Sequence, residues 1–339
     1  MRARRLRAGL RGWGGVGAMA AVCALALAWI LLLPLARPHG AGGAPAGDGG
    51  QTARATQARA GSCTDADAQN RSLPPSAAEG ATVRAIKERG YLSVGVDQNS
   101  YRWGYLNPNN ASGALEGFDI DLAHRIARDL LGDADKVQFR AIPTNERVPA
   151  IRSGRVDMVV RTMTITCDRL EQVAFSAPYF LTGQQVLAPR TSAVTGYDGS
   201  LAGRRICSAE GSTAYDHLSA DKKSGRLPAS TDISTTVPNQ LDCLVRLQLG
   251  ECDAVVTDGA LAASQAAQDP TVALKGDTFT REYYGVAMKL GADDLVRRVN
   301  RVLEDYRKDG GWKASYDKWL SPTLGKDSES ATPPAASYR

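Results

Sequence analysis

One short pattern occurs twice in this chain and constrains its fold more than any other feature. The two segments are SGRVDMVVRT, residues 153–162, and LGECDAVVTD, residues 249–258. Each contains a Gly, an Asp three residues later and then a pair of Val, and each follows an amphipathic helical pattern that ends near the Gly. Because the apolar run after the Asp is typical of a short strand, a helix leads into a strand twice. The repetition predicts two α/β halves of similar build.

Polar groups follow both of these predicted strands. Two α/β halves that face each other leave a cleft where the carboxyl ends of their strands meet, and ligands bind at such edges. Thr162, Thr164 and Arg169 follow the first strand and offer hydroxyl groups and a cation. Thr257 and Asp258 follow the second strand and offer a carboxylate. Together these groups predict a site for one small zwitterion.

The basic excess of the chain is confined to its start. The chain has 41 Lys and Arg against 36 Asp and Glu, which gives a net charge of +5. Residues 1–36 contain no acid, and their basic residues are Arg2, Arg4, Arg5, Arg7 and Arg11. The rest of the chain is therefore neutral. This composition excludes the concentrated basic face that a nucleic-acid partner requires.

The apolar run from residue 16 to residue 35 is uncharged, and its length is about that needed to cross a bilayer. Residues 1–36 therefore predict a basic cytoplasmic start followed by a transmembrane anchor or signal peptide. The rest of the chain then lies on the extracytoplasmic face of the membrane. Cleavage near Ala44-Pro45-Ala46, which would release a secreted protein, is the alternative. Residues 37–81 and 323–339 predict a disordered linker and a disordered tail.

The cysteines suggest two disulfide bonds, because thiols pair outside the cytoplasm. Beyond Cys23, they are Cys63, Cys167, Cys207, Cys243 and Cys252. Cys207 and Cys243 both lie in the second half, at a predicted strand end and helix start, and we expect them to be bonded. A Cys63–Cys167 bond between the linker and the first half is the second expectation, with Cys252 left as a buried thiol. None has the C-x-x-C spacing of a zinc site, so we expect no metal, and we expect no cofactor.

Six segments, in this order, carry a resemblance to a known family. They are GFDIDLAHRIA (117–127), RVDMVVRTMTITCDR (155–169), VAFSAPYF (173–180), EGST (210–213), CDAVVTDGALA (252–262) and GWKASYDKWL (311–320). Together they resemble the extracellular solute-binding proteins, family 3, of polar amino-acid ABC transporters. The resemblance spans roughly residues 83–322. It is strongest to the subgroup from Gram-positive bacteria described as glutamate- or glutamine-binding.

The resemblance implies an α/β fold of the type II periplasmic-binding-protein kind. This fold is a clamp of two lobes, each a sheet flanked by helices, joined by two hinge strands and closing on ligand. We expect lobe 1 to comprise residues 82–187 and 284–322, and lobe 2 to comprise residues 188–283. The apolar runs Leu187 to Pro189 and Tyr284 to Lys289 are the expected hinge strands.

The resemblance also assigns roles to the residues around the predicted cleft. Arg169 matches the family arginine that binds the α-carboxylate of the ligand, with the backbone amides of Thr164 and Thr213 beside it. Asp258 matches the acid that binds the α-ammonium group, together with the Thr162 carbonyl and the Thr164 hydroxyl. The alternatives are a surface ion pair for Arg169 and a helix cap for Asp258.

The choice of ligand side chain depends on three further residues. Thr144 and Arg147 occupy the positions where binders of acidic amino acids place a hydroxyl and an arginine toward the distal carboxylate. Arg147 stands at a predicted helix start, where a solvated position is the alternative. Asp97 departs from the acidic-ligand pattern. It either selects for an amide or forms a salt bridge that orients Arg147.

The expected function is extracytoplasmic binding of a polar L-amino acid by a monomer, for delivery to an ABC permease. Glutamate and aspartate are favoured, and glutamine and asparagine come next. A membrane-tethered sensor that signals to a membrane protein is the alternative, since sensing and delivery use the same pocket. We do not expect an enzyme, because the chain lacks the motifs of common catalytic sites. A dehydratase on the same fold is the minor alternative, with Asp97 as its candidate acid or base.

Overall fold

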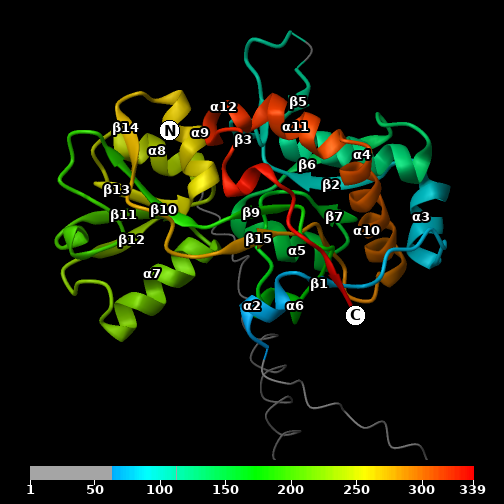
Figure 1. The fold of residues 1–339 in the computed structure, drawn as a ribbon, viewed down its shortest axis with the longest axis horizontal. Coiled ribbons are helices and arrows are strands. Elements are labelled where there is room, and N and C mark those ends of the chain that lie inside the picture. The colour runs from blue at the N-terminus through cyan, green and yellow to red at the C-terminus, as the bar shows by residue number, and fades with distance from the viewer. Residues whose placement is uncertain (1–62, 112) are drawn as a thin grey trace, which may run out of the picture. The chain divides into compact units, whose positions relative to one another are not determined.

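The computed structural model describes residues 63–111 and 113–339 (Figure 1). The apolar run of residues 16–35, on which the predicted anchor or signal peptide depends, lies outside the described residues, as does most of the predicted linker. None of the helices in the described part of the chain is both long and apolar enough to cross a membrane.

The first lobe is built on a five-stranded sheet with the strand order β6-β2-β7-β16-β8. Strand β2 is parallel to β6 and β7, whereas β16 is antiparallel to β7 and β8. The strands are β2 (Leu92–Val96), β6 (Val137–Ala141), β7 (Met158–Val159), β8 (Ala174–Phe175) and β16 (Ala287–Met288). The principal helices of this lobe are α3 (Ala81–Arg89), α4 (Phe118–Leu131), α5 (Arg147–Arg152), α10 (Asp293–Lys308) and α11 (Gly311–Trp319).

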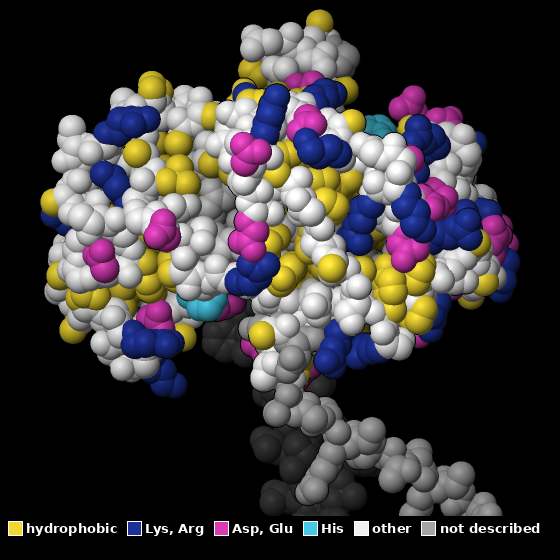
Figure 2. Space-filling view, viewed as in Figure 1, with side chains coloured by type: hydrophobic (Ala, Val, Ile, Leu, Met, Phe, Trp, Pro, Cys, Tyr) yellow, Lys and Arg dark blue, Asp and Glu magenta, His cyan; other side chains and the backbone are white. Residues whose placement is uncertain are grey.

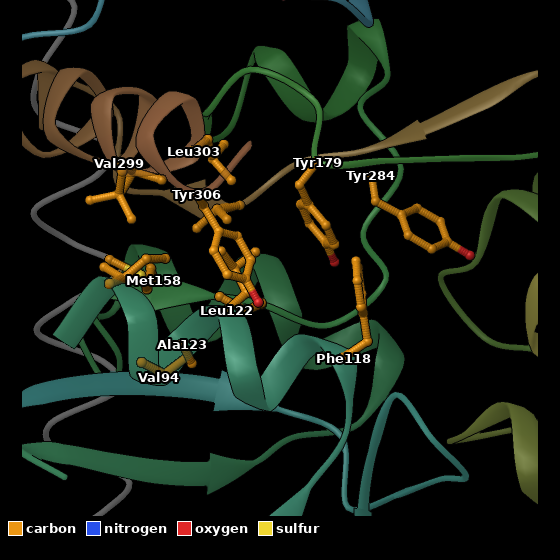
Figure 3. Close-up of a cluster of buried hydrophobic side chains, with 14 of the residues drawn as sticks. Val94, Phe118, Leu122, Ala123, Met158, Tyr179, Tyr284, Val299, Leu303 and Tyr306 are labelled. Atoms are coloured by element: carbon orange, nitrogen blue, oxygen red, sulfur yellow. The ribbon is translucent and has the colours of Figure 1, made fainter. Parts of the chain in front are cut away.

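The core of this lobe lies between the sheet and the helices α4 and α10. Figure 3 shows Val299, Leu303 and Tyr306 of α10 above Phe118, Leu122 and Ala123 of α4, with Met158 of β7 at a height between them and Val94 of β2 beside Ala123. Burying these side chains stabilises the lobe by removing apolar surface from water. The same packing holds the carboxyl ends of β2 and β7 in place, and the polar residues discussed below follow directly from these ends.

The second lobe repeats this build, with the strand order β12-β11-β13-β10-β14. Strand β11 is parallel to β12 and β13, and β10 is antiparallel to β13 and β14. The strands are β10 (Gln184–Pro189), β11 (Arg205–Ala209), β12 (Asp232–Val237), β13 (Ala254–Asp258) and β14 (Val272–Lys275). The helices are α7 (Thr213–Ser224), α8 (Gln240–Gln248) and α9 (Gly259–Gln268). The repeated pattern therefore marks α5 with β7 and α8 with β13, as the sequence predicted.

The chain passes between the lobes along two antiparallel strands, β9 (Phe180–Thr182) and β15 (Glu282–Tyr284). Figure 1 shows them between the two larger sheets. The prediction of Leu187 to Pro189 as a hinge strand is wrong, because these residues complete β10 inside the second sheet, where Leu187 is fully buried. Tyr284 does end a crossing strand, but the rest of its predicted run enters β16 of the first sheet.

The C-terminal segment is ordered, so the predicted disorder of residues 323–339 is wrong. It contains a short helix, α12 (Ser321–Leu324), and a strand, β17 (Ser337–Tyr338), that pairs in parallel with β1 (Arg71–Ser72). The polar composition concealed specific anchors, such as the buried Ala331. The described part of the predicted linker, residues 63–81, is likewise ordered through α2 (Asp65–Ala68) and β1.

Both expected disulfide bonds are present. Cys63 is bonded to Cys167, and Cys207 of β11 is bonded to Cys243 of α8. Cys252 is free and buried. The first bond ties the beginning of the described chain to the first lobe, and the second ties a helix of the second lobe to its sheet.

Removing the Cys207–Cys243 bond should lower the free energy of unfolding by about 4 kcal/mol, because the cross-link reduces the conformational entropy of the unfolded chain. The two residues are separated by 36 positions. Denaturant unfolding of the Cys207→Ala/Cys243→Ala variant measures the loss. Cys252→Ala is the matched control, since it removes a buried sulfur that has no bridge. The expectation would be wrong if the double variant lost no more than twice the free energy of unfolding that Cys252→Ala loses.

Candidate ligand-binding cleft

A cleft of about 1470 Å³ lies where the lobes meet. Residues of both lobes and of a crossing strand line it, including Thr144, Arg147, Thr164, Arg169, Gly211, Thr213, Asp216, His217 and Glu282. Figure 2 shows Lys and Arg side chains interspersed with Asp and Glu over one face of the described residues. In the cleft, the charged side chains of Arg147, Arg169 and Glu282 are each held by specific hydrogen bonds.

Arg169 is held between the two lobes. It lies in the short helix α6 (Cys167–Leu170), and the side chain of Thr166 caps this helix by accepting a hydrogen bond from the Arg169 amide at 3.3 Å. The Arg169 guanidinium donates through Nη1 to the carbonyl of Thr164 at 2.7 Å and through Nη2 to the carbonyl of Gly211 at 3.1 Å. Thr164 belongs to the first lobe and Gly211 to the second. The guanidinium therefore stands at the seam of the cleft.

Arg147 reaches the same point from another direction. It begins α5 and is buried, and it donates through Nε to the Thr144 carbonyl at 2.8 Å and through Nη2 to the Gly211 carbonyl at 3.1 Å. Burial, and then the neighbouring guanidinium groups of Arg169 and Arg161, hold the pKa of Arg147 well below its usual value. An anion that enters the cleft would relieve this repulsion.

Gly211 brings the lobes together because it has no side chain. Its φ of +71° lies in the left-handed region, and a Cβ at this position would lie 2.9 Å from the Cα of Asn145 in the first lobe. Nearby, the amide of Thr144 donates to the carbonyl of Pro238 in the second lobe at 3.0 Å. The two lobes thus meet through backbone groups, and a larger residue at Gly211 would push them apart.

A buried ion pair lies behind this seam. Asp97 follows β2, and its Oδ2 lies 2.9 Å from Nη2 of Arg161, whose side chain is fully buried. Asp97 also accepts a hydrogen bond from the Ser100 hydroxyl at 2.8 Å. Arg161 donates to the hydroxyl of Thr144 and to the side-chain oxygen of Asn239, each at 3.0 Å. Because Asn239 belongs to the second lobe, the pair links both lobes.

The structure corrects the expected partner of Asp97. Its ion-pair partner is Arg161 rather than Arg147, and Asp97 does not line the cleft. Sequence reasoning missed Arg161. A signal was available, because a cation directly after the apolar run MVV, at the carboxyl end of a buried strand, requires an acid close by.

The predicted ammonium acceptor, Asp258, ends β13 and is also buried behind the cleft wall. Its carboxylate accepts hydrogen bonds from the side-chain amide of Gln184 and from the Tyr284 hydroxyl. Burial, and then the charge of Glu282, raise the pKa of Asp258 to about 7. Near neutral pH, this carboxyl group therefore exchanges between its protonated and ionised forms.

Glu282 presents a carboxylate to the cleft, and sequence reasoning missed it. Its Oε2 accepts hydrogen bonds from the hydroxyls of Thr164 at 2.7 Å and Thr213 at 2.9 Å. Its Oε1 accepts from the side-chain amide of Gln184 at 3.1 Å. Two predicted ligand contacts, one from each lobe, are thus brought together on one acid. The available signal was an acid two positions before a buried aromatic residue, Tyr284, in the run REYYGVAM.

The predicted site residues fall into two groups. Those that line the cleft are Thr144, Arg147, Thr164, Arg169 and Thr213. Those that lie behind its wall are Asp97, Thr162 and Asp258. The Thr162 carbonyl accepts from Arg147 at 3.4 Å, and its amide donates to Asp119 at 3.1 Å. No group of three or more His, Cys, Asp or Glu within residues 63–111 and 113–339 is placed to hold a metal ion.

Residues 92–322 match the family described as bacterial extracellular solute-binding proteins, family 3. The chain belongs to this family. The match covers both five-stranded sheets, the crossing strands and the polar residues of the cleft described above. It confirms the family expected from the sequence.

Known members of family 3 resemble the chain over most of their length. An ABC transporter glutamine-binding protein from Bacillus subtilis is 34% identical over 239 residues, which is 70% of this chain and 84% of the relative. A glutamate-binding protein from Corynebacterium efficiens is 29% identical over 264 residues, 74% of this chain and 84% of the relative. A solved solute receptor for L-cysteine from Neisseria gonorrhoeae is 30% identical, with a TM-score of 0.68, and covers 75% of this chain and 100% of its own. These likenesses confirm the type II two-lobed fold.

Replacing Asp97 by alanine should lower the free energy of unfolding by about 3–5 kcal/mol, because Arg161 would stay buried without its counter-charge. Urea unfolding measures this loss. Glu329→Ala is the control, since it breaks the exposed ion pair with Arg281 and should change the free energy by at most about 1 kcal/mol. An Asp97→Ala effect no larger than the control would show that Asp97 does not balance Arg161.

The ligand-free protein should lose stability as pH rises from about 4 to about 7. Asp258 and Asp119, whose pKa burial also raises to about 7, stay protonated in the folded state over this range, whereas unfolded Asp ionises near 3.8. The folded state therefore binds more protons, and its advantage disappears as these groups ionise. Unfolding free energies at pH 5 and pH 8 measure the slope. Asp258→Asn should make the slope shallower, and Asp253→Asn, at a carboxyl with a lowered pKa, should preserve it.

Proposed function

We propose that this protein binds a polar L-amino acid in its cleft, outside the cytoplasm, for delivery to an ABC permease. We propose glutamate or aspartate ahead of glutamine or asparagine. The observation that carries the proposal is the arrangement of charge at the seam. Arg147 and Arg169 line the cleft and meet at Gly211, while Glu282 lines it from the crossing strand. Two cations and one acid match two carboxylates and one ammonium group.

The α-carboxylate is proposed to bind Arg169. A guanidinium binds a carboxylate through two parallel hydrogen bonds, and the Arg169 group is already anchored by the Thr164 carbonyl. Thr213 is the first residue of α7, a helix of 12 residues capped by Ser212. The amides at such a helix start favour a negative group. The names of the glutamine- and glutamate-binding relatives support an amino-acid ligand.

The distal carboxylate of an acidic ligand is proposed to bind Arg147, with Thr144 beside it. Arg147 is buried among guanidinium groups, so a second anion would stabilise its charged form. An amide ligand would leave this repulsion unrelieved. The position of Asp97 also affects this choice, because its carboxylate forms an ion pair with Arg161 and does not line the cleft. It therefore exerts no direct repulsion on a distal carboxylate from the cleft wall.

The same position of Asp97 weakens the dehydratase alternative. A dehydratase needs an acid or base at the reacting centre that is not engaged in an ion pair, and Asp97 was the candidate. An ion pair with a fully buried Arg161 leaves Asp97 committed to the structure. We therefore propose a binding protein rather than an enzyme.

Sensing by a membrane-tethered protein is a second candidate, favoured by the disulfide bond that joins Cys63 to the first lobe. Cys63, Ala66 and Gln69 line the cleft, and Cys63 is bonded to Cys167, two positions before Arg169. A change at the ligand site would therefore reach the segment that leads toward the predicted anchor. Delivery and sensing differ in the membrane partner alone. Neighbouring genes for a permease and ATPase would support delivery, and genes for a membrane protein with a kinase would support sensing.

Calorimetry on the protein, unfolded and refolded to remove carried-over ligand, tests the proposal with glutamate, aspartate, glutamine and asparagine. We expect the acidic ligands to bind at least about tenfold more tightly than the amides. A preference for the amides would refute the role of Arg147. No heat with any of the four would refute the proposed ligand class.

Two variants locate the ligand groups in the same assay. Arg169→Ala should weaken every ligand by about 2–5 kcal/mol, because the shared α-carboxylate loses its counter-charge. Arg147→Ala should weaken glutamate and aspartate more than their amides. Equal losses for acids and amides with Arg147→Ala would show that Arg147 does not contact the distal group.

A further inference from the structure

We propose that the Cys63–Cys167 disulfide is a site of thiol exchange that controls how tightly the cleft holds its ligand. A dithiol reductant opens the bond and releases residues 63–69, called here the N-terminal wall, from the cleft. Reoxidation of the two cysteines restores the wall. The ligand in this inference is the amino acid of the proposed function, on which the inference rests.

The N-terminal wall lies outside the part of the chain that matches the family. Cys63, Ala66 and Gln69 line the same cleft as the residues proposed to bind the ligand. The match to family 3 covers residues 92–322. The wall is therefore added to a cleft whose proposed ligand contacts come from the matched part, and these contacts remain when the wall leaves.

The disulfide is the covalent attachment of the N-terminal wall to the first lobe. Figure 1 shows α2, which follows Cys63, beside α6, which begins at Cys167. The chain after the wall is held separately, because the Ser72 hydroxyl donates to the Phe175 carbonyl at 2.9 Å and accepts from the Asn300 side chain at 2.8 Å. Opening the bond removes the covalent restraint on the wall while β1 stays anchored.

The two disulfide bonds differ in their exposure to solvent. Cys63 is exposed and Cys167 is half-buried, whereas Cys207 and Cys243 are both fully buried. In thiol exchange a thiolate must reach a disulfide sulfur, and exposed bonds are the labile ones. A reductant should therefore open Cys63–Cys167 while Cys207–Cys243 stays closed.

The exchange consists of two displacement steps. A thiolate of the dithiol attacks Sγ of Cys63 and forms a mixed disulfide there, while the sulfur of Cys167 leaves as a thiolate and takes up a proton. The second thiol of the reductant, as a thiolate, then attacks the reductant's own sulfur in the mixed disulfide. Cys63 leaves as a thiolate and takes up a proton. The dithiol is oxidised to a disulfide, and the protein gains two electrons and two protons.

The disulfide also restrains the arginine that is proposed to bind the α-carboxylate. Cys167 is the first residue of α6, and Arg169 is the third residue of this four-residue helix. A helix of this length is not stable by itself. The bond at Cys167 therefore helps to fix the backbone from which the Arg169 guanidinium reaches the carbonyls of Thr164 and Gly211.

Gln69 gives the N-terminal wall a polar group for the ligand. Its side chain is 5% exposed and lines the cleft, and it forms no hydrogen bond with another residue in the ranges 63–111 and 113–339. A side-chain amide has two donors on its nitrogen and two lone pairs on its oxygen. A charged group of the ligand, directly or through a water molecule, satisfies this amide while the disulfide holds the wall in place.

Graded mixtures of reduced and oxidised dithiothreitol, applied to the full chain, test the order in which the bonds open. Alkylation followed by mass spectrometry of peptides identifies the reduced cysteines. We expect Cys63 and Cys167 to be alkylated in mixtures that leave Cys207 and Cys243 bonded. This measurement needs no ligand, so its result is independent of the proposed function.

L-Glutamate, or L-glutamine where the amide binds more tightly, then reports on the cleft. We expect reduction to weaken binding at least about tenfold, mainly through faster dissociation measured by stopped-flow fluorescence, and reoxidation to reverse the change. Linkage requires the ligand at saturation to stabilise the disulfide by the same factor. A tenfold factor shifts the midpoint of reduction by about 30 mV toward more reducing mixtures.

Three variants assign the effect to the N-terminal wall. Cys63→Ser/Cys167→Ser should bind the ligand like the reduced wild type and should not respond to the reductant. Gln69→Ala should weaken binding at least about threefold in the oxidised protein and have little effect in the reduced protein, where the wall has left the cleft. Gln172→Ala is the matched control, because Gln172 also lines the cleft but is exposed and donates to the Asp168 carbonyl. Its effect should be equally small in both forms, and circular dichroism checks that each variant is folded.

Three outcomes would overturn the inference and leave the proposed function standing. The first is equal affinity of the oxidised and reduced wild type for the ligand. The second is simultaneous opening of both disulfide bonds. The third is an equal loss with Gln69→Ala in both forms, which would show that the wall stays in the cleft without the bond. Failure of the oxidised wild type to bind any of the four amino acids would instead refute the proposed function, and the inference with it.

Discussion

The geometry of the cleft depends on the contact of two arginines with one backbone carbonyl. Arg147 and Arg169 extend from different parts of the first lobe, and both donate to Gly211 of the second. The approach is close because Gly211 has no Cβ, which would otherwise meet the backbone of Asn145. Two arginine side chains of the first lobe thus meet one backbone carbonyl of the second. This contact brings the guanidinium groups within reach of a ligand in the cleft.

The charged residues at the seam fall into two groups. Some form ion pairs behind the wall of the cleft, and others line the cleft. Arg161 is paired with Asp97 behind the wall, while Arg147 and Arg169 are held by carbonyl groups and line the cleft. A carbonyl orients a guanidinium without cancelling its charge, so the carbonyl contacts leave both groups positively charged. The acids are divided in a similar way, because Asp258 lies behind the wall of the cleft and Glu282 lies at its surface.

The relation between sequence and structure differs from one element to another. The repeated segment predicted two similar lobes because a helix before a parallel strand leaves a strong local pattern. The two copies of this pattern form α5 with β7 and α8 with β13. The hinge prediction failed because an apolar run such as Leu187 to Pro189 looks alike in a core strand and in a crossing strand. The C-terminal tail failed for the opposite reason. Its polar composition hid a few buried anchors and a strand that pairs with residues far away in the chain.

The sequence by itself determined the family, the two-lobed fold, the cysteines available for bonding and five of the polar residues that line the cleft. These depend on local patterns and on motifs that can be read in order. The tertiary structure alone decided which charges pair with each other and which line the cleft. Asp97 and Arg161 are far apart in the chain, as is Glu282 from Thr164 and Thr213, whose hydroxyls donate to it. Electrostatic interactions depend on distance and burial in the folded protein, and neither quantity is encoded in any local segment.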